Sequence, residues 1–295
     1  MSAISDRTSV QTLSRVLRSP TGVFGLTVSV LLVLIAIYPY FTVHDYASVE
    51  VSRRLSGPSG THPLGTDHLG RDLLARLLFG ARVALIVAVP AVAGAVVVGG
   101  LMGVFAGYRG GRIDNVLVVA MDAMQAFPAI ILALALLAVL GPSIRNVIAA
   151  IIVALAPQYA RLTRALVLKL RQEPYIRSEQ ALGASHLRVI VRHILPNMFP
   201  PVVILASIDL AAAVTIEAGL SFLGIGVQAP TPSWGVMLAE GFGRVRDAPW
   251  PVVWPGLALI VTTLSLTMLG ESLRDALDVK MDRSPSSGPA ELTNE

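Results

Sequence analysis

The sequence predicts an all-α integral membrane protein that crosses the membrane six times. Of its 295 residues, 54% are hydrophobic and only 14% are charged, whereas charged residues make up about a quarter of a soluble domain. Apolar segments of the roughly 20 residues needed to cross a bilayer recur along the chain. The chain contains no cysteine, which excludes disulfide bonds, thiol catalysis and thiolate metal sites.

The first expected span covers residues 23–41, after a polar segment that carries Arg7, Arg15 and Arg18. Arginine and lysine are enriched in the cytoplasmic segments of membrane proteins, so the N-terminus is expected in the cytoplasm. Four apolar residues of this segment fall on one side of a helical wheel and predict a short helix at the membrane interface. They are Val10, Leu13, Val16 and Leu17.

Residues 42–80 are expected on the outer surface of the membrane. Proline and glycine mark a loop up to Gly65, after which Thr66 or Asp67 is placed to cap an amphipathic helix. A stripe of leucines would form the apolar face of this helix. Asp72 and Arg76 have the i, i+4 spacing of an ion pair on its polar face. This helix is expected to lead into the second span.

Five further spans are expected over residues 83–105, 116–140, 146–166, 199–225 and 250–269. The first of these five contains Gly94, Gly99, Gly100 and Gly103, and such small residues let helices approach closely in lipid. Residues 227–249 are expected to form an outer loop or re-entrant segment. Six spans place both termini in the cytoplasm, where the tail from Ser284 is rich in disorder-promoting residues.

Three carboxylates fall inside the expected spans: Asp122, Asp209 and Glu217. A carboxylate at membrane depth is costly unless it faces a cavity or a polar partner. These residues are therefore candidates for a pore lining or gate that contacts a ligand's ammonium group, or for a proton relay. A purely structural role, with hydrogen bonds inside the bundle or to a partner chain, is the alternative.

The longest polar interruption in the second half of the chain covers residues 171–196. It is rich in arginine, which places it in the cytoplasm. Residues 178–190 are expected to form one short amphipathic helix, with Ala181, Leu182, Ser185 and Val189 on its apolar face. Such a helix can lie on lipid headgroups or dock onto a protein partner.

Catalytic and metal-binding motifs are absent from the sequence. We find no P-loop, no GxSxG and no HExxH motif, and the five histidines are too scattered for a metal site. No nucleophile and base can be paired into an intramembrane enzyme. The net charge of +4 is explained by membrane topology, so nucleic-acid binding is not expected.

The polar interruption resembles the signature of binding-protein-dependent ABC importer permeases, in which E-A-A and three residues precede a glycine and a later I-x-L-P. Gly183 matches the glycine, and Leu195 and Pro196 match the final L-P, with Ile194 beside them. The E-A-A triplet is replaced by residues 177–179, so that Glu179 is its only acidic residue.

Longer blocks resemble the C-type subunit of the dipeptide/oligopeptide permease group. They are HPLGTDHLGRDLLARLLFGARVAL from His62, EAGLSFLGIGVQAPTPSWG from Glu217 and LGESLRDALD from Leu269. The resemblance covers nearly the whole chain beyond the N-terminal segment.

This resemblance implies a permease subunit of an ATP-driven importer of dipeptides or oligopeptides in the bacterial inner membrane, without an ATPase site or cofactor of its own. Implied partners are a homologous second permease, two cytoplasmic subunits that bind ATP and Mg, an extracytoplasmic binding protein and membrane lipid. Arg244 and Arg246 in the last outer loop are candidate contacts for the binding protein. The implied coupling helix, which docks on the ATPase, comprises Glu179, Ala181, Leu182, Gly183, Ala184, Ser185, Ile194, Leu195 and Pro196.

The expected organisation has four parts: a cytoplasmic segment (1–21), the first span with its outer segment (22–80), a permease core of five spans (81–273) and a cytoplasmic tail (274–295). Two alternatives remain. The same machinery can carry nickel, haem or another small solute, or the carboxylates can serve a proton-coupled secondary transporter.

Overall fold

A computed structural model describes residues 14–38 and 46–281, and this part of the chain is almost entirely helical. Five helices are long and apolar enough to cross a membrane. They are α2 (Pro20–Ile37), α3 (Leu73–Arg109), α6 (Ile144–Leu170), α9 (Leu195–Phe222) and α11 (Trp250–Met281). Their number and order confirm the predicted multi-pass membrane protein. The predicted disordered tail and most of the predicted N-terminal interfacial helix lie outside the described residues.

The third expected span, over residues 116–140, is a bent pair of helices. The expected straight helix over residues 116–140 is instead α4 (Gly111–Gln125) followed by α5 (Ala129–Leu140), with a bend of 93° between them. Pro128 lies at this break. A proline has no backbone N–H and disfavours the helical conformation of the residue before it, so a helix cannot continue undisturbed through Phe127.

The amphipathic helix expected from Thr66 or Asp67 does not exist as a separate element. The side chain of Asp72 caps α3 by accepting a hydrogen bond of 3.0 Å from the backbone N–H of Leu74. From there α3 continues without interruption for 37 residues, a length of about 55 Å. Asp67 instead holds a turn by accepting from the backbone N–H groups of Leu69 and Arg71. The predicted ion pair between Asp72 and Arg76 is wrong, because Arg76 pairs with Glu240 and Asp67.

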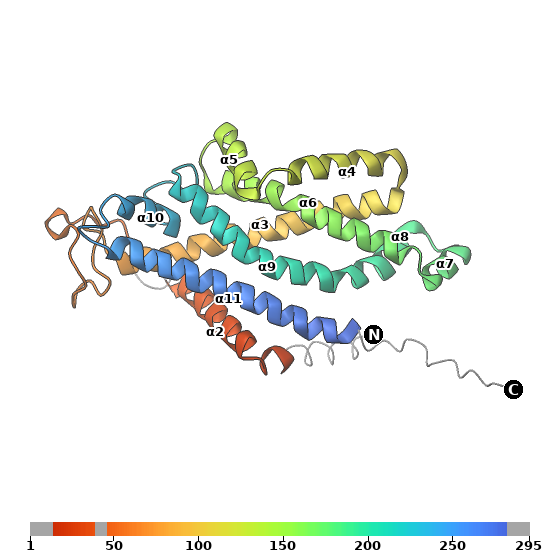
Figure 1. Cartoon of the computed structure of the whole chain (residues 1–295), viewed down its shortest axis with the longest axis horizontal. Helices are drawn as coiled ribbons and strands as arrows, with labels where there is room; N and C mark the ends of the chain where they lie inside the picture. Colours follow the sequence, from red (N-terminus) through yellow and green to blue (C-terminus); the bar gives the residue numbers. More distant parts are fainter. Residues whose placement is uncertain (1–13, 39–45, 282–295) are drawn as a thin grey trace.

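The packing of α3 against α6 forms the centre of the bundle, and the two helices run side by side in Figure 1. Small residues make this approach possible, as the sequence predicted. A Cβ atom on Gly99 would lie 2.1 Å from the carbonyl oxygen of Ala156, and one on Gly103 would lie 2.2 Å from that of Ala160. The next glycine along the chain, Gly100, faces open space.

This contrast gives a matched pair of variants. Gly99→Ala is expected to destabilise the isolated subunit by about 1–3 kcal/mol, because its methyl group overpacks the α3–α6 interface. Gly100→Ala is expected to be neutral or stabilising by about 0.5–1 kcal/mol, because alanine is the better helix former. Thermal unfolding of the purified variants in detergent measures both, and equal effects would contradict the close helix contact at Gly99.

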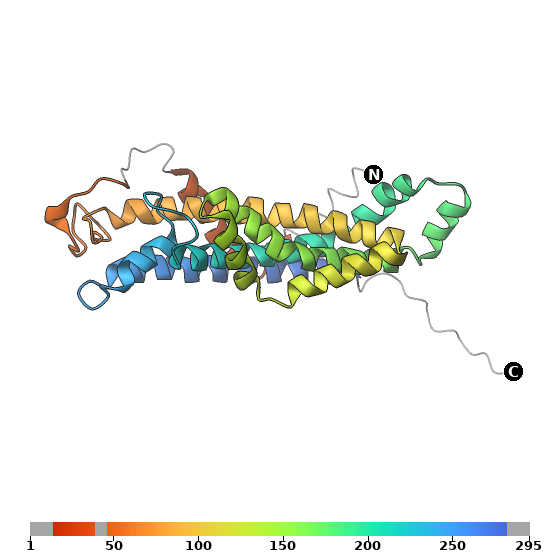
Figure 2. The ribbon, with the colours of Figure 1, turned by 90° about the horizontal axis from the view of Figure 1, so that it is seen from above.

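The helices form an elongated bundle with two distinct ends (Figures 1 and 2). The first residues of α2, the last residues of α11 and the short helices α7 (Pro174–Ala181) and α8 (His186–Val189) lie toward one end. The opposite end carries residues 46–72, which include η2 (Val51–Arg53), together with α10 (Trp234–Phe242). We call these the α7 end and the α10 end.

Candidate functional site

The predicted single helix over residues 178–190 is wrong, because the chain turns in its middle. Helix α7 ends at Ala181, and Gly183 has a φ of +85°. After this turn come α8 and a π-helical segment, η3 (Ile190–Ile194), which leads directly into α9. The apolar periodicity from Ala181 to Val189 therefore spans two helices and does not define one face.

Gly183 causes the turn through its backbone conformation. Its N–H donates to the carbonyl of Gln180, and the N–H of Ala184 donates to that of Glu179, both at 3.0 Å. This hydrogen-bond pattern ends a helix at a residue with positive φ, a conformation that glycine adopts without strain. A Cβ atom on Gly183 would meet nothing within 4 Å, so its conformation, and not close packing within this chain, requires glycine. Ser185 then caps α8 through its side chain.

A small buried cluster fixes the α7–α8 segment to the ends of the long helices. Ile176 of α7, Val189 of α8 and Ile194 of η3 are completely buried. They form one cluster with Val104, Val167 and Met198, which lie on α3, α6 and α9. Ile194, predicted as part of the docking surface, is therefore a residue of this internal cluster.

The side of the same segment that faces away from the bundle is exposed and carries apolar side chains. Leu182 is 87% exposed and Leu187 is 71% exposed. Ala181 and Ser185 are also exposed, while Glu179 is partly exposed with its carboxylate 3.8 Å from the imidazole of His193. We call the exposed residues Ala181, Leu182, Gly183, Ser185 and Leu187 the α7–α8 surface. Leu195 and Pro196 are exposed at the start of α9, and Ala184 is half-buried. Large apolar side chains in such positions mark a surface for a protein or membrane partner.

The end of α3 is tied to this segment by polar contacts. The Tyr108 hydroxyl lies 2.9 Å from Nδ1 of His186. The guanidinium of Arg171 donates to the carbonyl oxygens of Gly107 and Tyr108, and it lies over the Tyr108 ring at 5.1 Å. The α7–α8 segment is therefore attached to α3 as well as to α6 and α9, to which the chain connects it directly.

Two of the three membrane-depth carboxylates are buried on α9. Asp209 accepts a hydrogen bond of 2.5 Å from the side-chain amide of Gln158. Glu217 accepts one of 2.7 Å from the hydroxyl of Ser221, which itself accepts from the backbone N–H of Val227. Glu217 thus fixes the turn that follows α9. The two carboxylates are eight residues apart, about 12 Å along the helix axis, and each has its own partner.

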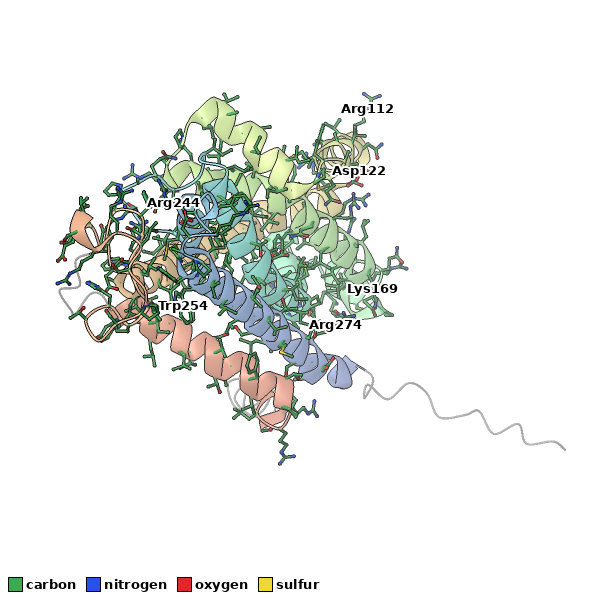
Figure 3. The ribbon with its side chains drawn as sticks, turned by 60° about the vertical axis from the view of Figure 1, so that its left-hand side comes forward. Arg112, Asp122, Lys169, Arg244, Trp254 and Arg274 are labelled. Carbon is green, nitrogen blue, oxygen red and sulfur yellow. The ribbon has the colours of Figure 1, made fainter. Side chains whose placement is uncertain are left out.

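Asp122 is in a different environment. Its carboxylate pairs with Arg161 of α6 at 2.5 Å, and both side chains are 56% exposed. In Figure 3, Asp122 and Arg112 project from α4 at the edge of the bundle. Arg161 lies inside the span expected over residues 146–166, and α6 continues beyond that span to Leu170.

Arg164, one turn further along α6, forms a second ion pair. Its Nε and Nη2 atoms donate to the two carboxylate oxygens of Asp114 at 2.5 and 2.7 Å. Neither Asp114 nor the pairing of Arg161 and Arg164 with carboxylates on α4 was predicted from the sequence. The signal available was the repetition of arginine at i and i+3 just inside the end of an apolar span.

At the α10 end, a buried ion cluster joins Asp67, Arg71 and Arg76 to Glu240 of α10. Glu240 accepts hydrogen bonds of 2.8 Å from both Arg71 and Arg76, and Arg71 also donates to Asp67 at 2.6 Å. Arg76 is 1% exposed. Asp67, His68 and Glu240 are near enough to one another to hold a metal ion, but the two arginines already neutralise both carboxylates, which disfavours a cation. Burial lowers the pKa of His68.

Three indole N–H groups strengthen the same connection by donating to backbone carbonyls of Leu64, Thr66 and Leu77. Trp254 bonds to Leu64 at 3.1 Å, Trp250 to Thr66 at 3.2 Å and Trp234 to Leu77 at 3.0 Å. Arg246 is exposed in the turn after α10, while Arg244 is half-buried there. In Figure 3, Arg244 and Trp254 lie far from Lys169 of α6.

Comparison with known proteins is consistent with these features. Residues 99–283 match the family described as "Binding-protein-dependent transport system inner membrane component". A dipeptide transport system permease protein of Alkalihalophilus pseudofirmus is 40% identical over 265 residues, which cover 90% of this chain and 87% of the relative. A probable D,D-dipeptide transport system permease protein of Escherichia coli is 38% identical, covering 89% and 88%. A glutathione transport system permease protein of Pectobacterium atrosepticum is 37% identical, covering 90% and 89%. The chain belongs to the family of inner membrane permease components of binding-protein-dependent transport systems.

Proposed function

We propose that this chain is a permease subunit of an ATP-driven ABC importer that carries dipeptides or oligopeptides across a bacterial inner membrane. The observation that carries the proposal is the α7–α8 surface, an exposed apolar surface fixed to three long helices. The names of the relatives, which include dipeptide and glutathione permeases, support a peptide as the solute. ATP and Mg would be bound by separate subunits.

The charge distribution supports a cytoplasmic position for the α7 end. Residues 171–193 contain Arg171, Arg177, Arg188 and Arg192, with only two acidic residues among them. At the α10 end, Glu240 and Asp67 offset arginines in ion pairs. An excess of arginine marks the cytoplasmic side. Both termini are then cytoplasmic, with residues 1–21 and 274–295 flanking a first span with its outer segment (22–80) and a core of five spans (81–273).

The attachment of the α7–α8 segment suggests how ATP binding would drive transport. Two ATP-binding subunits would hold the coupling segments of this chain and of a homologous second permease. When the ATPase subunits close, each coupling segment would move as a rigid body, because its underside is buried against α3, α6 and α9. The long helices would tilt with it and open the pathway to the other side. With the E-A-A triplet absent, the α7–α8 surface and Glu179 would make the contact.

The α10 end would receive an extracytoplasmic binding protein. Three indoles and the ion cluster hold residues 64–77 against α10 and α11, which gives this end a rigid surface. Arg246 is exposed on it and Arg244 is half-buried, so Arg246 is the stronger candidate contact.

Uptake into proteoliposomes tests the proposal. The assembled complex is expected to import a labelled peptide only with ATP inside and loaded binding protein outside, whereas this chain alone imports nothing. Uptake by the chain alone, abolished by a protonophore, would instead establish a proton-coupled transporter. The separate partners of Asp122, Asp209 and Glu217 argue against a continuous proton relay.

A further inference from the structure

The ion pair between Asp122 and Arg161 joins α4 of the bent pair to α6, both of them in segments apolar enough to cross a membrane, and is exposed on the surface of this chain. Arg161 precedes the last residue of α6, Leu170, by nine positions, which places it about 14 Å inside that end of the helix. Asp122 lies in the last turn of α4, just before the bend. Both side chains are 56% exposed.

An exposed ion pair inside a membrane-spanning segment is costly to place against lipid tails. Ionisable groups inside a membrane face a water-filled cavity or another protein chain. Here the pair lies in an open surface cavity of about 350 Å³, which is also lined by Val118, Met121 and Arg164. The cavity thus has charged groups of both signs on an otherwise apolar wall.

The neighbouring ion pair is built differently. Arg164 uses two guanidinium nitrogens on the two oxygens of Asp114, and these side chains are only 28% and 11% exposed. Arg161 uses only Nη2, on one oxygen of Asp122. Among the described residues, neither the remaining donors of Arg161 nor the second oxygen of Asp122 has another side-chain partner. The Arg164–Asp114 pair uses both carboxylate oxygens, whereas the Arg161–Asp122 pair leaves hydrogen-bonding groups facing the cavity.

We propose that Asp122 and Arg161 form a contact site for zwitterionic peptides in the translocation pathway. The peptide's ammonium group binds Asp122, and its carboxylate binds the free edge of Arg161, whose planar fork suits a carboxylate. Without peptide, the two residues neutralise each other. With peptide, one ion pair is exchanged for two and the net charge of the site stays zero. This inference rests on the proposed function and names the part of the substrate that the pathway would recognise.

A thiol-protection assay tests the site in the complete complex. Because this chain has no cysteine, Val118→Cys places a single thiol in the cavity wall, in a complex whose other subunits are made cysteine-free. A charged thiol reagent is expected to modify it. Dialanine at millimolar concentration is expected to slow modification by 1 + [L]/Kd, about threefold at twice Kd. N-acetylalanine amide, a neutral probe of similar size, is expected to give no protection.

Two variants complete the assay. Asp122→Asn/Arg161→Gln, added to Val118→Cys, is expected to remain reactive but to lose protection by dialanine. Val119→Cys, the 68% exposed neighbour, reports modification outside the cavity and is expected to show no protection. An unreactive Val118→Cys, absent protection or equal protection by the neutral probe would each overturn the inference. ATP-driven uptake by the unmodified complex, measured separately, tests the proposed function, so the two can fail independently.

Discussion

Replacing Gly183 with valine is expected to leave the protein inserted in the membrane while reducing peptide uptake by about tenfold or more. The position is exposed and a Cβ atom there meets nothing within this chain, so folding of the bundle does not depend on it. A side chain at φ of +85° costs about 1–2 kcal/mol, and more when it is β-branched. The strain is relieved by rearranging the turn, which displaces the α7–α8 surface from its partner.

Gly183→Asn is the matched control, because asparagine tolerates positive φ better than other residues. We expect it to retain most of the uptake. Uptake and ATPase activity are measured together in proteoliposomes to distinguish an uncoupled complex from an inactive one. Gly183→Val should keep basal ATP hydrolysis but lose its coupling to transport. Normal uptake by Gly183→Val would show that the turn is not part of the coupling surface. Equal loss in both variants would point to side-chain volume and not to backbone conformation.

Glu240→Leu is expected to destabilise the α10 end by about 3–5 kcal/mol, the usual consequence of removing one partner from a buried ion pair. The substitution leaves two guanidinium groups, those of Arg71 and Arg76, with Asp67 as their remaining counter-charge in the cluster. These arginines are 7% and 1% exposed, so water cannot compensate them. The contact of residues 67–72 with α10 would then loosen, while the indole bonds from Trp250 and Trp254 of α11 remain.

Thermal unfolding and hydrogen exchange of residues 46–72 measure this effect. The control is Glu50→Leu, which removes an exposed pair with Arg53 at the same end, where both side chains are 48% exposed. An exposed pair contributes about 0–1 kcal/mol, so this variant is expected to remain close to the unmodified protein. Similar stabilities for Glu240→Leu and Glu50→Leu would show that the cluster does not hold residues 46–72 in place.

Most of the bundle could be predicted from the sequence because membrane spans are determined by length and hydrophobicity. Gly99 and Gly103 likewise predicted a close contact between helices, which the structure shows between α3 and α6. The bend at Pro128 could have been suspected from the proline, but its angle depends on packing against α6 and α9. The continuity of α3 was missed because the polar residue Arg76, which suggested a surface helix, is buried by partners from α10.

The candidate site was only partly predictable. Gly183 was identified, but the apolar spacing of Leu182 and Val189 suggested one helix, and only the positive φ at Gly183 reveals two. Arg161 falls inside the expected span 146–166, but its partner Asp122 lies on another helix, 39 residues away in the sequence, and no local pattern predicts the pair. Glu240 and Arg71 are 169 residues apart, and no local pattern indicates a contact over that separation.

The central claim is that the α7–α8 surface contacts an ATP-binding subunit, and site-directed photo-crosslinking at Leu182 tests it most directly. Leu182→Cys would be the only thiol of this chain, and a maleimide–benzophenone probe attached to it needs no cysteine on the partner. Arg246→Cys, at the α10 end, is the control. The account predicts a cross-linked product between Leu182→Cys and the ATP-binding subunit, and none between that subunit and Arg246→Cys. Cross-linking of Leu182→Cys to lipid alone in the assembled complex would contradict it.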